Sequence, residues 1–496
     1  MSLSPSATGL LTGTMSEHRD AVVKASPAVV QGGMGVGVSG WKLANAVARS
    51  GGLGVVSGTA LDLVLTRRLQ NGDVGGDVRE ALAAFPYQGT AERILARYLR
   101  HPADAEAGHT FRPTPQMGLR ASKSRDELTV AANFVEVFLA RRGHDGPVGI
   151  NYLEKIQLAT PSSVYGAMLA GVDYVLMGAG VPAQIPRLLN ALAAGGTGSI
   201  DLTVEGAHTG ERFYVGFDPL SIFGAAPLLP RPLFLAVVAS HAIAAYLARD
   251  AATCPDGFIV ETPVAGGHSA RPRGPATFDA EGQPVYGPRD EADLEKFRKL
   301  GMPFWLAGGY GTPDKLRAAL AEGAAGVQVG TPFGLSRESG MAEEVRAALI
   351  RSALAGDINV RNDALASPTG FPFKMVTLAG TVGVDEVYAE RERNCDLGYL
   401  RTAYRKDDGR VGYRCPSEPV DVFVAKGGDA AATVGRRCVC NGLAATIGLP
   451  QTRPSGYQEA PLVTLGQDLE FLRALLPDGS ESYSAQDVMD YLTGQQ

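Results

Sequence analysis

The chain has 496 residues, of which 45% are hydrophobic, and a formal net charge of −6 at pH 7. This length exceeds the commonest size of a single domain and suits an α/β barrel with insertions. The acidic balance argues against a nucleic-acid-binding protein, which carries a basic patch or stripe.

Residues 1–25 lack the basic region and long apolar core of a signal peptide, so no signal peptide is predicted and the segment is expected to be a flexible leader. No apolar run in the chain approaches the roughly 20 residues that a membrane span requires. We therefore expect a cytoplasmic protein without a membrane partner.

The next part of the chain is predicted to form a parallel sheet, because short apolar runs alternate with amphipathic helices. Eight runs are predicted as strands: AVVQ at 28–31, LGVVS at 53–57, VGIN at 148–151, VDYVLM at 172–177, LFLAVVAS at 233–240, GFIVE at 257–261, PFWLAGG at 303–309 and AGVQVG at 325–330. Eight such strands favour a (β/α)₈ TIM barrel over residues 26–340. An open, doubly wound sheet is the alternative.

Three segments are additional to the alternating strands and helices of the predicted barrel. Residues 59–145 are predicted as a helical insertion between the second and third strands. Residues 196–231 read as polar strands and turns, which predicts a β-hairpin before the fifth strand. Residues 341–496 form a C-terminal extension, expected to be one helix followed by an irregular tail that carries four cysteines.

Glycines cluster where three of the predicted strands end. They occur in QGGMGVGVSG at 31–40, at Gly308 and Gly309, and at Gly330 beside Thr331. Each cluster alone is explained by a tight turn, but glycine also lets backbone N–H groups approach a ligand closely. Because the loops after strands seven and eight of a TIM barrel commonly bind phosphate, the last two clusters predict a phosphate site.

A single histidine, His268, follows the sixth predicted strand in ETPVAGGHSARPRG, residues 261–274. A lone histidine is more often structural, but this one is expected at the same face as the glycine loops, where its pKa suits general acid–base chemistry. Arg271 and Arg273 are predicted to hold an anionic substrate or a carrier phosphate, and to disfavour the protonated histidine. The alternative is that both are surface charges paired with DEADLE at 290–295.

Five motifs recur together along the barrel. They are GGMG after the first strand, GIN in the third, AGGH after the sixth, AGG after the seventh and QVGT after the eighth. In this order they resemble the nitronate monooxygenase family, formerly the 2-nitropropane dioxygenases, whose signature FMN-dependent enoyl-ACP reductases share. The resemblance covers roughly residues 26–340. The sequence departs from the family pattern at Glu261, where simple nitronate monooxygenases often carry glutamine, and in the two insertions and the extension.

The resemblance implies a TIM barrel that binds FMN non-covalently, with His268 as the catalytic histidine. It assigns the following residues to the flavin ring or its phosphate: Gly33, Met34, Asn151, Gly266, Gly267, Gly308, Gly309, Gln328, Gly330 and Thr331. Glu154 and Lys155 follow Asn151 at the same face and are candidates for a substrate or flavin contact.

The expected function is an FMN-dependent monooxygenase that oxidises nitronates or related carbanions with O₂. One alternative is an enoyl thioester reductase that uses NAD(P)H and serves a polyketide or fatty acid synthase. Another is a flavin-binding partner subunit of such a complex. The substrate is expected to be a small or carrier-bound molecule, and a homo-oligomer or a synthase partner stays open.

Cys395, Cys415, Cys438 and Cys440 all lie in the extension. In a reducing cytoplasm such a group is more typical of a metal site or of plain thiols than of disulfides. Four cysteines are a candidate site for Zn²⁺ or an iron–sulfur cluster. Their irregular spacing lacks the usual CxxC pair, so reduced, partly buried thiols are the alternative.

Overall fold

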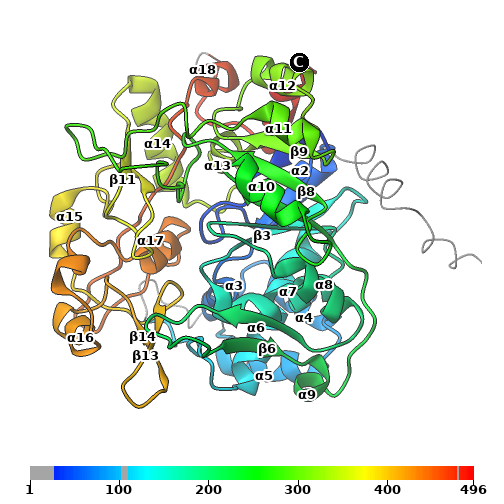
Figure 1. Ribbon diagram of the computed structural model, residues 1–496, viewed down its shortest axis with the longest axis vertical. Helices are drawn as coiled ribbons and strands as arrows, with labels where there is room; N and C mark the ends of the chain where they lie inside the picture. The colour runs from blue at the N-terminus through cyan, green and yellow to red at the C-terminus, as the bar shows by residue number, and fades with distance from the viewer. Residues whose placement is uncertain (1–26, 102–109, 478–479, 496) are drawn as a thin grey trace, which may run out of the picture.

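The structure is a computed structural model that describes residues 27–101, 110–477 and 480–495. The predicted leader lies outside these described residues. Figure 1 shows the barrel on the right, with the C-terminal extension in yellow to orange covering one side of it.

Eight parallel strands form a closed barrel. They are β1 (Val29–Gln31), β2 (Gly54–Ser57), β3 (Val148–Leu153), β4 (Tyr174–Gly178), β7 (Leu233–Val238), β8 (Gly257–Glu261), β9 (Phe304–Ala307) and β10 (Gly326–Val329). Their order around the sheet is β1-β10-β9-β8-β7-β4-β3-β2. A parallel bridge between Val30 and Leu53 joins β1 to β2 and closes the ring. The predicted TIM barrel is therefore confirmed, and the open sheet is wrong.

Helices surround the barrel and pack against it. They are α2 (Trp41–Arg49), α7 (Thr160–Leu169), α8 (Ile185–Ala193), α10 (His241–Ala248), α11 (Leu294–Lys299), α12 (Pro313–Ala321) and α13 (Thr331–Gly334). In α2 the buried positions Leu43, Ala44, Val47 and Ala48 recur at helical spacing. Residues of β2, β4 and β9 are buried throughout, as expected of parallel strands covered on both faces.

The two predicted insertions have the expected structure. Residues 59–145 contain α3 (Leu61–Gln70), α4 (Asp77–Ala84), α5 (Gln88–Tyr98) and α6 (Lys123–Ala140). The second insertion is an antiparallel hairpin of β5 (Gly198–Leu202) and β6 (Phe213–Phe217), followed by α9 (Pro219–Phe223). In Figure 1 both insertions lie at the bottom of the view.

The extension begins with the predicted helix, α14 (Glu343–Ala355), but its tail is not irregular. It contains β11 (Asn359–Asp363), β12 (Phe373–Thr377), α15 (Asp385–Glu390), β13 (Thr402–Arg405), β14 (Val411–Arg414), α16 (Val420–Ala425), α17 (Val439–Thr446), α18 (Phe471–Leu475) and α19 (Ala485–Thr493). Two of its antiparallel pairs are β11–β12 and β13–β14. The tail gains its order by packing on the rest of the chain, and α19 returns to contact α2 and α12.

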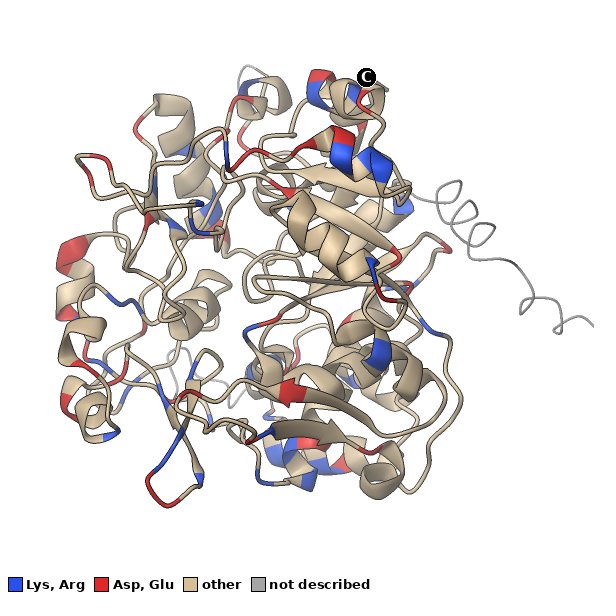
Figure 2. Ribbon diagram, in the orientation of Figure 1, with Lys and Arg blue, Asp and Glu red and all other residues tan. Residues whose placement is uncertain are grey.

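Charged residues of both signs are interspersed over the outer helices and loops (Figure 2). Exposed pairs such as Arg298–Glu322, at 2.9 Å, contribute about 0–1 kcal/mol each, so burial of apolar side chains dominates the stability of the barrel. Among the described residues, no helix has the length and apolarity that crossing a bilayer requires.

Candidate active site

Two cavities meet at the carboxyl ends of the barrel strands. The first, called the glycine cavity, has about 1090 Å³ of empty space and is lined by backbone from Gly32, Gly266, Gly308, Gly330 and Gly466, among others. The second, called the histidine cavity, has about 1020 Å³ and contains His268. Gly33, Glu261, Gln328 and Thr464 line both, so the two form one continuous site.

The structure brings the predicted flavin residues and His268 together around this site. Those that line the glycine cavity are Gly33, Met34, Gly266, Gly267, Gly308, Gly309, Gln328, Gly330 and Thr331. Asn151 and His268 line the histidine cavity. Residues separated by up to about 300 positions therefore meet because parallel barrel strands all end at one face.

The backbone at two positions after β9 favours a residue without a side chain. Gly308 and Gly309 have φ angles of +85° and +77°, in the left-handed region that glycine tolerates. A Cβ at Gly308 would lie 2.4 Å from Thr262 Oγ1, and a Cβ at Gly309 would lie 3.3 Å from Val264 Cγ2. The loop therefore presents bare backbone to the glycine cavity.

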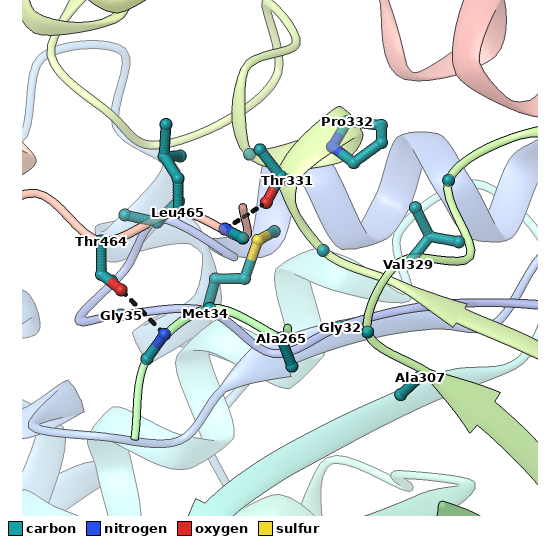
Figure 3. A pocket seen from close by; sticks show the side chains of 18 of the residues that line it. Gly32, Met34, Gly35, Ala265, Ala307, Val329, Thr331, Pro332, Thr464 and Leu465 are labelled. Carbon is teal, nitrogen blue, oxygen red and sulfur yellow. Dashed lines mark hydrogen bonds between the residues drawn. The ribbon is translucent and has the colours of Figure 1, made fainter. Parts of the chain in front are cut away.

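The loop that carries His268 is held by the extension from two sides. The Gly267 N–H donates to Thr464 Oγ1 at 2.8 Å, a contact drawn in Figure 3. The Lys374 N–H of β12 donates to the Gly267 carbonyl at 2.8 Å. Similarly, the Gly466 N–H donates to Thr331 Oγ1 at 2.8 Å (Figure 3). The extension thus fixes both the histidine loop and the predicted phosphate loop.

His268 is half-buried, and its ring packs edge-on against Phe373 with centroids 4.8 Å apart. Its Nε2 is 2.7 Å from Ser367 Oγ. Burial lowers the pKa of His268 to about 4, and the ammonium of Lys155 adds to this effect. The imidazole is therefore neutral near pH 7, which a general base requires.

A second titratable group, Glu261, lies where the two cavities join. Burial raises the pKa of Glu261 to about 7, although the nearby Lys374 opposes this shift. Lys374 is fully buried, and its Nζ donates to the Pro263 carbonyl and to Ser269 Oγ. Burial also lowers the pKa of Lys374 to about 8. Glu261 is the residue that departs from the family motif, and no sequence pattern indicated its buried partner.

The two predicted substrate arginines line neither cavity. Arg271 donates to the Gly370 carbonyl at 2.6 Å and stacks over Phe371, and Lys155 lies over the same ring. Arg273 donates to the backbone carbonyls of residues 239 and 289. The low pKa of His268 comes from burial and Lys155, and the predicted contribution of the arginines is absent from its causes.

The four cysteines of the extension surround one small cavity of about 250 Å³. No group of three or more His, Cys, Asp or Glu within the described ranges is arranged to hold a metal ion, so the predicted Zn²⁺ or iron–sulfur site is not supported. Burial raises the pKa values of Cys438 and Cys440, and a hydrogen bond with Cys415 raises that of Cys395.

The roof of the histidine cavity was not predicted. It comes from the extension and consists of Phe373, Tyr399, Leu400, Val439, Cys440, Leu443 and Thr464. Tyr399 donates its hydroxyl hydrogen to the buried carboxylate of Asp62 at 2.7 Å, which connects the roof to the helical insertion. These residues follow no local motif, so the sequence contained no signal for them.

A third cavity, called the outer cavity, continues from the histidine cavity. It has about 880 Å³, and Ile156, Tyr399 and Leu400 line both. Its other walls come from the helical insertion at Met117, the hairpin at Leu202 and Thr203, and the extension at Thr369 and residues 401–403. Backbone hydrogen bonds of 2.9 Å between Glu205 and Ala403 and between Arg405 and Glu205 join the hairpin to β13.

Residues 232–363 match the family model described as nitronate monooxygenase. The matched range contains His268 and the glycine loops after β9 and β10. The match confirms the predicted resemblance and supports the assignment of the chain to the oxidoreductases. No match was found among the curated proteins.

Three solved structures have similar folds. FabK from Thermotoga maritima is 16% identical, with a TM-score of 0.46 over 96% of this chain and 95% of that chain. A nitroalkane oxidase from Streptomyces ansochromogenes is 17% identical, with a TM-score of 0.44 over 96% and 97%. The enoyl reductase domain of MlnA, from the macrolactin biosynthesis cluster of Bacillus amyloliquefaciens, is 10% identical, with a TM-score of 0.45 over 97% and 96%.

Proposed function

We propose that the chain is an FMN-dependent oxidoreductase with its active site in the joined glycine and histidine cavities. The observation that carries this proposal is the continuity of the two cavities, with bare glycine backbone at one end and a neutral histidine at the other. The family match over residues 232–363 supports a flavin as the cofactor.

The residues present fit FMN. Gly308 and Gly309 take the left-handed backbone that only glycine adopts easily, and together with Gly330 and Thr331 they would hold the phosphate. Gly266 and Gly267 line both cavities and would pass beneath the ring. When bound, FMN supplies the acceptor and donor of electrons that no side chain of the site provides.

The first candidate reaction is oxidation of a nitronate or related carbanion with O₂. His268 would remove the proton next to the nitro group, because its pKa of about 4 keeps it unprotonated near neutral pH. The apolar roof, including Phe373, Leu400 and Val439, would bind an alkyl chain and exclude water.

The second candidate is reduction of an enoyl thioester with NAD(P)H. The observation that favours it is the outer cavity, because an extended carrier-bound substrate needs room beyond the catalytic histidine. Its lining includes Gln157, Thr203 and Thr402, which can hydrogen-bond a polar chain, and the cations Lys155 and Arg401. Arg401 donates hydrogen bonds to the backbone carbonyls of Gly398 and Met117 and to the amide oxygen of Gln116, and all three of these partners are uncharged.

The purified protein is expected to be yellow and to release FMN on denaturation. Gly309→Val should weaken FMN binding by about tenfold or more, which corresponds to about 1.4 kcal/mol. The reason is that a side chain would enter the space of the phosphate and strain a backbone with φ +77°. Titration of the apoprotein by flavin fluorescence measures this affinity.

Gly323→Val is the matched control. Gly323 has φ +81°, and a Cβ there would lie 3.2 Å from Arg298 Cδ, so the backbone strain and crowding are similar. Gly323 precedes β10 at the opposite end of the barrel, so this variant should keep its FMN affinity. Equal affinities of the Gly309→Val variant and the wild type would place the phosphate elsewhere.

Anaerobic mixing with reductants separates the candidate reactions. For the first candidate we expect alkyl nitronates to bleach the flavin absorbance, with KM falling about fourfold per added methylene. Each buried CH₂ contributes about 0.8 kcal/mol, and the roof that would receive the chain is apolar.

Bleaching by NAD(P)H, followed by recovery on addition of an enoyl thioester, would assign the second candidate instead. An absorbance that responds to neither reagent would contradict both reactions and leave the chain as a flavin-binding partner subunit.

A further inference from the structure

A chain of three side chains leads from His268 out of the histidine cavity. His268 Nε2 lies 2.7 Å from Ser367 Oγ, and Ser367 Oγ lies 2.8 Å from Thr369 Oγ1. Ser367 is fully buried, whereas Thr369 is half-buried and lines the outer cavity. The two hydroxyls therefore connect the imidazole to the outer cavity.

Backbone hydrogen bonds complete the coordination of both hydroxyls. The Thr369 N–H donates to Ser367 Oγ at 3.2 Å, and the Phe371 N–H donates to Thr369 Oγ1 at 3.4 Å. A hydroxyl accepts two hydrogen bonds and donates one. If His268 Nε2–H donates to Ser367, then Ser367 must donate to Thr369, and the hydrogen of Thr369 is left for water. The opposite direction satisfies all groups equally well.

His268 cannot keep a proton for long near neutral pH. Burial and the charge of Lys155 lower its pKa to about 4. Lys155 lies over Phe371 on one side, Arg271 lies over the same ring, and Glu261 faces the same cavity as the imidazole. A proton taken from a substrate therefore needs a route away from the histidine cavity.

We propose that Ser367 and Thr369 form a proton relay between His268 and water in the outer cavity. The relay rests on the proposed function only in taking His268 as the acid–base group. The outer cavity, which Thr369 lines, has room for water. Ser367 and Thr369 act through His268 and are positioning residues.

The step balances without any redox change. The substrate C–H bond breaks, its electron pair stays on carbon, and the proton bonds to His268 Nδ1. The proton on Nε2 moves to Ser367 Oγ, the hydroxyl proton of Ser367 moves to Thr369 Oγ1, and that of Thr369 moves to water. Run in reverse, the same relay delivers a proton to a substrate, so it serves either candidate reaction.

The relay is tested first without turnover, by NMR of protein labelled with ¹⁵N in its histidine rings. The chain has seven histidines, and His268→Asn identifies the resonance of interest. Thr369→Val keeps the His268–Ser367 bond but removes the exit, so exchange of the His268 ring N–H with water should slow by about tenfold or more. Thr369→Ser restores the hydroxyl and should restore the wild-type exchange rate. Unchanged exchange in Thr369→Val overturns the relay.

Turnover supplies the second readout. With a substrate whose reaction includes a proton transfer, a neutral nitroalkane or an enoyl thioester, Ser367→Ala and Thr369→Val should lower kcat by about 10²-fold, the lower end of what a positioned acid–base group contributes, with little change in KM. Ser367→Thr should recover most of the rate. Ser162→Ala is the control, because this buried hydroxyl on α7 donates to Ala159 and is outside the relay. Wild-type kcat in both relay variants overturns the relay. Inactivity of the wild type with all substrates contradicts the proposed function alone, because the exchange experiment tests the relay without turnover.

Discussion

Replacing His268 with asparagine should lower kcat/KM for a neutral nitroalkane by about 10²- to 10⁴-fold while FMN stays bound. The physical reason is that His268 is the neutral imidazole of the histidine cavity, held by Ser367 at 2.7 Å and packed on Phe373. For the pre-formed nitronate the loss should be much smaller, because its proton has already left. Stopped-flow flavin reduction with both substrate forms measures the difference.

His208→Asn is the control for this variant, because His208 is exposed on the turn of the β5–β6 hairpin. It should leave both rates unchanged. An equal loss for nitroalkane and nitronate in His268→Asn would mean that His268 orients the substrate without acting as a base. An unchanged rate for both would remove His268 from the chemistry.

The assignment of His268 as the general base fixes the direction in which kcat/KM depends on pH. Since the pKa of His268 is lowered from 6.5 to about 4, the base form should persist across neutral pH. The kcat/KM should fall only as the pH decreases through about 4. Lys155→Gln should move this fall to higher pH, and only partly toward 6.5, because burial is the larger cause of the shift.

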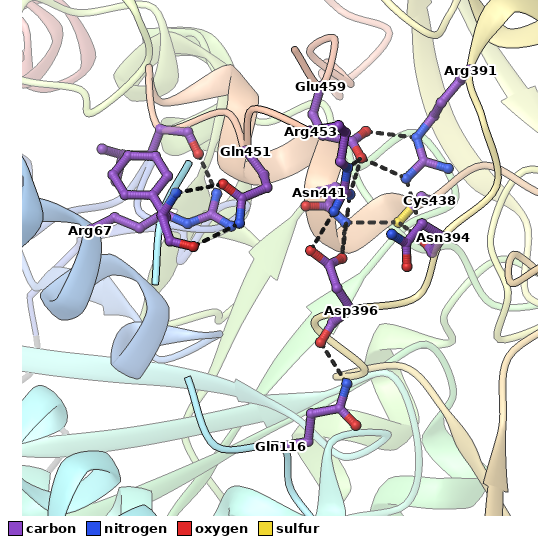
Figure 4. Close-up of polar contacts among 12 residues, drawn as sticks. Arg67, Gln116, Arg391, Asn394, Asp396, Cys438, Asn441, Gln451, Arg453 and Glu459 are labelled. Carbon is purple, nitrogen blue, oxygen red and sulfur yellow. Dashed lines mark hydrogen bonds and ion pairs between the residues drawn. The ribbon is translucent and has the colours of Figure 1, made fainter. Parts of the chain in front are cut away.

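Replacing Glu459 with glutamine should lower the free energy of unfolding by about 3–5 kcal/mol, because it leaves the buried charge of Arg391 without its carboxylate partner. Glu459 accepts two hydrogen bonds from Arg391, at 2.7 and 2.9 Å, and one at 3.0 Å from Arg453 Nε. The Arg391 and Glu459 side chains are only 5% and 1% exposed. Figure 4 shows that Arg453 also pairs with Asp396, at 2.7 Å.

This network connects parts of the extension that form the roof of the histidine cavity. Asp396 accepts a hydrogen bond from Asn441 of α17 at 2.7 Å, and the same helix carries the roof residue Leu443 (Figure 4). Glu322→Gln is the control, because its pair with Arg298 is about half exposed and should contribute at most about 1 kcal/mol. Urea unfolding of both variants measures the effect, and equal midpoints would show that the buried network adds no stability.

The barrel and its glycine loops were predictable because their signals are local. A strand buried on both faces is a short apolar run, and the left-handed backbone at Gly308 and Gly309 strongly favours glycine. The position of His268 followed from the same reasoning, since it comes directly after β8 and all strands of a parallel barrel end at one face.

The extension shows the limit of local signals. Four cysteines in one segment predicted a metal site, and folding does collect them around one cavity, but not in an arrangement that holds a metal ion among the described residues. Composition reveals which side chains are present, whereas ligation depends on distances and directions that only packing sets.

The sequence by itself determined the barrel, the strand that precedes the loop of His268 and the glycine backbone of the predicted phosphate loops. Only the tertiary structure decided what surrounds that histidine. Thr464, Lys374 and Ser367 lie about 100 to 200 residues away along the chain and reach the loop through hydrogen bonds. Such contacts leave no periodicity or motif, because each depends on where a distant segment docks, and yet they set the position of His268 and its proposed proton route.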